Sequence, residues 1–130
     1  MKYWLDYVRH CYDLVLESEG HTDLILDHEV EAYVVHLMAR NFERTDIGQV
    51  AVAIKMMQAL NEGGKSSLVE VADECLLIHS YPLKRQRWPT ATYYQDMGMT
   101  AYGMAGHIME EHFIPAGRIL NAIFRRTVSL

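Results

Sequence analysis

The side chains of this sequence that could do chemistry gather between residues 71 and 105, where one predicted helix ends and another begins. Asp73 lies in the first of these helices, and Tyr94 and Tyr102 lie eight residues apart, near one face of the second. Arg85 and Arg87 lie in the basic turn between the helices, so either could fold back to pair with Asp73. These five residues could bind a small molecule or an anion. We favour a hydroxyl–carboxylate network that fixes the angle between the two helices.

Metal binding is a second chemical hypothesis, because the chain holds 7 histidines in 130 residues. Glu111 follows His107 by one helical turn, and Glu29 and His36 share a face of an earlier helix. Carboxylates and imidazoles on facing helices can hold one or two metal ions, in some cases for redox chemistry. No Glu-x-x-His occurs, however, and a solvated helix face explains the same residues. We therefore predict no cofactor and keep these four residues as the alternative ligands.

Other catalytic and binding classes have little support in the sequence. Cys11 and Cys75 lie on apolar helical stripes without CxxC spacing, which indicates two buried thiols rather than a nucleophile or a disulfide. The segment that ends in Gly64-Lys65-Ser66 lacks the first glycine of a phosphate-binding loop, since position 59 is Ala59. A net charge of −5 argues against nucleic-acid binding. We expect a protein that is not an enzyme.

Hydrophobic periodicity predicts an all-α, single-domain bundle of five or six helices. Gly20 should end the first helix, which starts at Lys2 and runs to about Ser18. The fifth helix should carry Ile108 on its apolar face and kink or restart near Pro115, which lacks a backbone donor. The helices are expected at about 2–18, 27–42, 45–62, 67–80, 90–114 and 116–126.

The N-terminal residues do not form a signal peptide, because Asp6, Arg9 and His10 interrupt the apolar residues. No apolar run is long enough to span a membrane. Together with the unpaired cysteines, these features favour a cytoplasmic protein without a membrane partner.

Apolar residues on more than one face of the third and fifth helices predict self-association, and we expect a homodimer. Gly98, Gly103 and Gly106 lie in or near the fifth helix, where each glycine costs up to ~1 kcal/mol relative to alanine. Close approach between helices would explain them. A protein partner of another kind is also compatible with this surface.

Several short motifs give the chain its one family resemblance. They are Asp27 to Tyr33, Asp73 to Leu77, Tyr81-Pro82, Arg85 and Arg87, Tyr93-Tyr94, Gly98 and Ala101-Tyr102. In these motifs the sequence resembles an uncharacterised family of small all-helical bacterial proteins, over about residues 25 to 105. Family members are expected to carry a Gly-Leu-Phe-Pro-like sequence where this chain has residues 79–82. The resemblance implies a bacterial cytoplasmic helical protein and implies no activity.

The sequence therefore favours a non-enzymatic helical interaction or adaptor protein. A metal-binding bundle is one alternative. A binder of small molecules or anions at the junction of the fourth and fifth helices is another.

Overall fold

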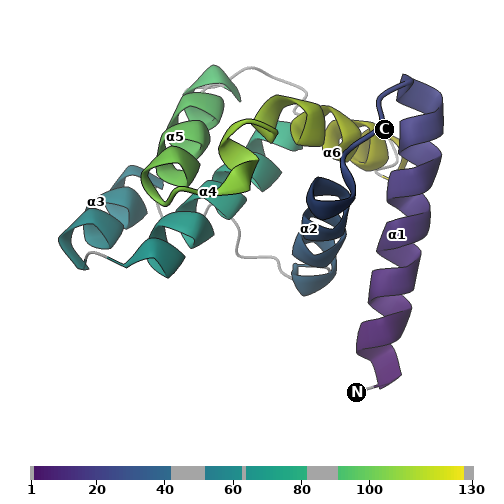
Figure 1. Cartoon of the computed structure of the whole chain (residues 1–130), viewed down its shortest axis with the longest axis horizontal. Coiled ribbons are helices and arrows are strands. Elements are labelled where there is room, and N and C mark those ends of the chain that lie inside the picture. Colours follow the sequence, from purple (N-terminus) through teal and green to yellow (C-terminus); the bar gives the residue numbers. More distant parts are fainter. Residues whose placement is uncertain (1, 42–51, 63, 82–90, 128–130) are drawn as a thin grey trace.

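The computed structural model describes residues 2–41, 52–62, 64–81 and 91–127 (Figure 1). These residues form six α-helices, one short 3₁₀ helix and no strand, which confirms the predicted all-α bundle. The elements are α1 (Lys2–Thr22), α2 (His28–Arg40), α3 (Val52–Glu62), α4 (Lys65–Ser80), α5 (Ala91–Met104), η1 (Ile108–Glu110) and α6 (Phe113–Thr127). The predicted start of the third helix, at residue 45 or 46, lies outside the described residues.

The helices form two groups that α6 joins. α1 packs along α2, while α3 and α5 both pack against α4. α6 crosses between the groups and contacts α1 and α4 (Figure 1). The candidate site lies between α2 on one side and α3 and α4 on the other.

The first helix is longer than the sequence predicts, because Gly20 does not end it. α1 continues to Thr22, whose hydroxyl donates a 2.7 Å hydrogen bond to the carbonyl of Ser18. The helix ends where Asp23 adopts a φ of 55°, the left-handed conformation that aspartate tolerates better than most residues. Gly20 is a helical residue with no neighbour near its missing side chain.

Buried carboxylates fix the α1–α2 pair. Glu19 accepts a 2.7 Å hydrogen bond from the backbone N–H of Leu26, which secures the link between the helices. Glu31 of α2 accepts a 2.6 Å hydrogen bond from the hydroxyl of Tyr12. α2 begins at His28, directly after Asp27, and the Asp27 side chain makes no capping hydrogen bond.

The fifth helix ends earlier than predicted, since α5 stops at Met104 and Ile108 belongs to η1. The chain turns at Gly106, which has a φ of +65°, and α6 starts at Phe113. Pro115 therefore lies in the first turn of a new helix, where a missing N–H leaves no hydrogen bond unmade. Of the two outcomes expected near this proline, restart of the helix is the one observed.

The core is one continuous cluster of buried side chains to which all six α-helices contribute. Tyr102 and Phe113 are among its largest fully buried side chains, and their rings pack edge to face with centroids 6.1 Å apart. Cys11 and Cys75 are buried free thiols. Burial raises the pKa of Cys11 to about 11 and that of Cys75 to about 12, so both thiols stay protonated at neutral pH.

Candidate functional site

Asp73 lies at the centre of a side-chain cluster that joins α2, α4 and α5. Its Oδ1 accepts a hydrogen bond from the hydroxyl of Tyr33 and a second, of 2.6 Å, from the hydroxyl of Tyr102. Its Oδ2 lies 3.7 Å from an Nη2 of Arg40. The residue is only 7% exposed. One carboxylate therefore takes three partners from two other helices.

His107 completes this group from the turn after α5. Its ring stacks on Tyr102 at a centroid distance of 5.2 Å and meets the ring of Tyr33 edge-on at 4.8 Å. Its Nδ1 accepts a 3.1 Å hydrogen bond from the backbone N–H of Met109. We refer to Asp73, Tyr33, Tyr102, Arg40 and His107 together as the Asp73 cluster.

The environment of Asp73 shifts the pKa of its carboxyl group upward. Burial is the largest cause, and the hydrogen bonds from Tyr102 and Tyr33 and the charge of Arg40 oppose it only in part. Burial and the neighbouring carboxylate also raise the pKa values of Tyr33 and Tyr102. Both hydroxyls therefore stay protonated and act as donors. These groups therefore form a structural network, in which Oδ1 accepts two hydrogen bonds and Oδ2, although it is ion-paired with Arg40, can still accept a hydrogen bond from another donor.

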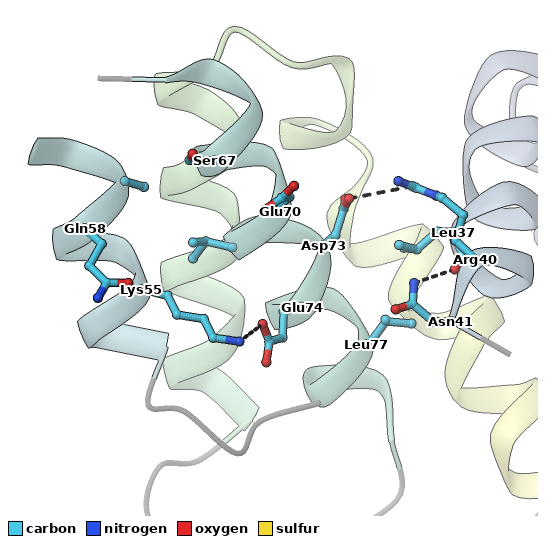
Figure 2. A pocket seen from close by; sticks show the side chains of 12 residues that line it. Leu37, Arg40, Asn41, Lys55, Gln58, Ser67, Glu70, Asp73, Glu74 and Leu77 are labelled. Carbon is cyan, nitrogen blue, oxygen red and sulfur yellow. Dashed lines mark hydrogen bonds and ion pairs between the residues drawn. The ribbon is translucent and has the colours of Figure 1, made fainter. Parts of the chain in front are cut away.

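A cleft of about 550 Å³ opens beside this cluster, between α2, α3 and α4 (Figure 2). Asp73 and Arg40 belong to both the cluster and the cleft. The walls mix charged, amide and aliphatic side chains. They are Leu37, Arg40, Asn41, Lys55, Gln58, Ala59, Ser67, Glu70, Val71, Asp73, Glu74 and Leu77.

An ion pair closes one side of the cleft. Nζ of Lys55 on α3 donates a 2.5 Å hydrogen bond to a carboxylate oxygen of Glu74 on α4. The Glu74 side chain is 7% exposed and that of Lys55 is 26% exposed, so the pair is partly shielded from water. It holds α3 against α4 and leaves these two charges balanced (Figure 2).

Of the three predicted junction residues that the structure describes, it brings two together. Asp73 and Tyr102 are directly hydrogen-bonded. Tyr94 instead packs against Tyr93, with the rings nearly perpendicular and their centroids 5.3 Å apart. Arg85 and Arg87 lie outside the described residues.

Sequence reasoning missed the two partners that α2 supplies. Tyr33 enters the sequence prediction only as the end of the motif from Asp27 to Tyr33, and Arg40 is not among the predicted site residues. Their spacing of seven residues places them on one helix face, which is a signal that could have paired them. That signal could not show that the face meets Asp73.

The alternative metal ligands do not form a group of three in the part of the chain that the structure describes. His107 uses Nδ1 toward Met109, and His36 donates from its own Nδ1 to the carbonyl of Ala32 at 2.8 Å. Glu29 and Glu111 are both exposed. Among the described residues, no further carboxylate, imidazole or thiol completes a set of three with any of these four, so the geometry adds no support to the metal hypothesis.

Comparison with protein-family models, with curated proteins and with solved structures finds no match to this chain. The predicted family resemblance thus stays a prediction. No helix among residues 2–41, 52–62, 64–81 and 91–127 is long and apolar enough to cross a bilayer.

Proposed function

We propose that this chain is a non-enzymatic helical interaction protein of the bacterial cytoplasm, and that its first partner is a second copy of itself. The observation that carries the proposal is the outer face of α3. Ile54, Met57 and Leu60 are 50%, 63% and 48% exposed, respectively. We refer to these three residues as the α3 apolar face.

The residues of the α3 apolar face follow one another at steps of three, so they form a continuous stripe along the helix. Residues at steps of three lie within one third of the helix circumference. The opposite side of α3 packs on α4 through the buried Met56 and Ala59. α3 therefore has a filled side and an apolar side that faces water, at the end of the molecule away from α1 (Figure 1).

A two-fold symmetric dimer would bury this stripe against its own copy. In such an interface the same surface patch serves both subunits, so one self-complementary helix face is sufficient to start it. Burial of large aliphatic side chains supplies the driving force, at roughly 25 cal/mol per Å² of apolar surface. The unbranched Met57 at the centre can adapt its shape to the opposing helix.

The test is the molar mass of the protein in solution, measured by light scattering across a range of concentrations. We expect twice the mass of one chain for the wild type and the mass of a monomer for Met57→Glu, because a carboxylate at the centre of the stripe would be desolvated in the dimer. Circular dichroism shows whether each variant keeps its helices.

The matched control is Leu16→Glu on α1, where Leu16 is 49% exposed. This variant should remain dimeric. A wild-type monomer at every concentration would overturn the proposal. Dissociation by Leu16→Glu, with Met57→Glu still dimeric, would instead move the interface to α1.

A further inference from the structure

The cleft between α2, α3 and α4 has the size and the lining of a small-molecule site. Its volume of about 550 Å³ lies within the ~300–1,000 Å³ that is typical of ligand pockets. Leu37, Val71 and Leu77 give it an apolar base and are each at most 7% exposed. Charged and amide groups of three helices surround that base (Figure 2).

Arg40 supplies the cationic wall of the cleft, and its terminal nitrogens can still donate hydrogen bonds to a ligand. Its side chain is 51% exposed, and its 3.7 Å approach to Asp73 is an ion pair longer than a hydrogen bond. Its Nε lies 3.4 Å from the carbonyl oxygen of His36 and leaves the two terminal nitrogens pointed toward the cleft (Figure 2). A planar guanidinium with two terminal nitrogens suits a carboxylate, which it can bind through two parallel hydrogen bonds.

Glu70 and Oδ2 of Asp73 supply the anionic wall. Glu70 is exposed on α4, three residues before Asp73 and therefore on the same side of the helix. Within the described part of the chain it has no ion-pair partner. Because Lys55 already neutralises Glu74, the charged groups that remain for a ligand among the described lining residues are Glu70 and the loosely paired Arg40 and Asp73.

These remaining charges discriminate between classes of ligand. A simple anion would satisfy Arg40 but would face two carboxylates. A simple amine would satisfy the carboxylates and leave the donors of Arg40 unused. A molecule that carries both groups satisfies both walls, and an aliphatic portion between them matches the apolar base.

We propose that this cleft binds a small zwitterion of the amino-acid type, with its carboxylate on Arg40 and its ammonium group between Glu70 and Asp73. The site goes beyond the proposed self-association, because the lining of the cleft includes no residue of the α3 apolar face.

The experiment starts with thermal-shift assays of the wild type against each free neutral amino acid. A concentration of about 10 mM is suitable, since it exceeds the ~1 mM dissociation constant of a weak complex. Isothermal titration calorimetry then compares the tightest amino acid with its amide, which lacks the carboxylate, and with its des-amino acid, which lacks the ammonium group. We expect each analogue to bind at least about tenfold more weakly, because each loses a charge-assisted contact.

Two variants assign the walls. Arg40→Gln should weaken binding of the amino acid and leave binding of its amide unchanged. Glu70→Gln should weaken binding of the amino acid and leave binding of the des-amino acid unchanged. Arg118→Gln and Glu111→Gln, at exposed positions outside the cleft, serve as matched controls and should bind like the wild type.

Three results would overturn the proposal. The first is that no neutral amino acid binds. The second is that one of the two analogues binds as tightly as the amino acid itself. The third is that the cleft variants and their controls change binding equally. The oligomeric state is measured separately, so failure here would leave the self-association proposal standing.

Discussion

Asp73 shows how one buried carboxylate can determine the position of several side chains. Two tyrosine hydroxyls share its Oδ1, and Arg40 approaches its Oδ2. Neither hydroxyl can ionise at neutral pH, since the pKa values of both tyrosines are raised. Without an acceptor at position 73, both hydroxyls would lose a hydrogen-bond partner in a poorly solvated place.

At the residue scale we predict that Asp73→Ala lowers the free energy of unfolding by about 1–3 kcal/mol, the usual cost of leaving buried polar groups unsatisfied. Urea denaturation measures this change. Asp73→Asn keeps an amide oxygen that can accept from both tyrosines, so it should cost less. An unchanged stability of the alanine variant would contradict a structural role for the hydrogen bonds of Asp73 and would favour a role for Asp73 in ligand binding alone.

At the scale of elements, each of the three glycines in or near the fifth helix occurs for a different structural reason. Gly98 allows α5 to approach α4 and α6, because a Cβ there would lie 2.5 Å from the ring of Phe113 and 2.9 Å from Cβ of Cys75. Gly103 lies against the carboxylate of Glu110, and Gly106 has a positive φ. The predicted close approach between helices therefore applies to Gly98.

We predict opposite effects for two Gly→Ala substitutions within helices. Gly98→Ala should destabilise the protein by about 1–3 kcal/mol, because the added methyl group overpacks a filled contact. Gly20→Ala should stabilise it by roughly 0.5–1 kcal/mol, since its Cβ meets nothing within 4 Å and alanine favours a helix. Chemical denaturation of both variants gives the two signs. Stabilisation by Gly98→Ala would show that α5 can move away from α4.

At the scale of the whole molecule, the Asp73 cluster links the two groups of helices. Tyr33 and Arg40 belong to the α1–α2 pair, whereas Asp73 and Tyr102 belong to the α3–α5 group. α6 joins the same groups through packing, and the guanidinium of Arg126 forms an ion pair with Glu17 of α1. The protonation of Asp73 should therefore affect the stability of the molecule as a unit.

The expected pH dependence follows from the direction of the pKa shift. Burial raises the pKa of Asp73 above the ordinary aspartate value of 3.8, so the folded protein holds this proton more tightly than the unfolded chain does. The contribution of Asp73 to stability is then greatest below pH 3.8 and decreases as the pH rises through the raised value. We predict that the wild type gains stability relative to Asp73→Asn as the pH falls through this window.

Urea denaturation of both proteins at several pH values measures that difference. The neighbours of Asp73, namely Tyr33, Arg40, Tyr102 and His107, are present in both proteins, so their own titration largely cancels. A relative loss of wild-type stability toward acid would mean that Arg40 and the tyrosines stabilise the carboxylate more than burial destabilises it.

The sequence by itself determined the class of fold and the features that arise from local pattern. Apolar residues at three- and four-residue spacing predict helices, because such spacing places them on one helix face. The same reasoning placed both cysteines in the core and Asp73 in a polar network with Tyr102. Local signals were weaker at helix ends, where Asp23 rather than Gly20 adopts the left-handed conformation.

Only the tertiary structure decided which distant side chains meet. Tyr33 lies 40 residues from Asp73, and Tyr102 lies 29 residues from it. Which helix faces come together depends on crossing angles and on the register between helices, which no local periodicity specifies. For that reason the α2–α4 cleft, the pairing of Arg40 with Asp73 and the exposure of the α3 apolar face all became visible only when the helices were packed together.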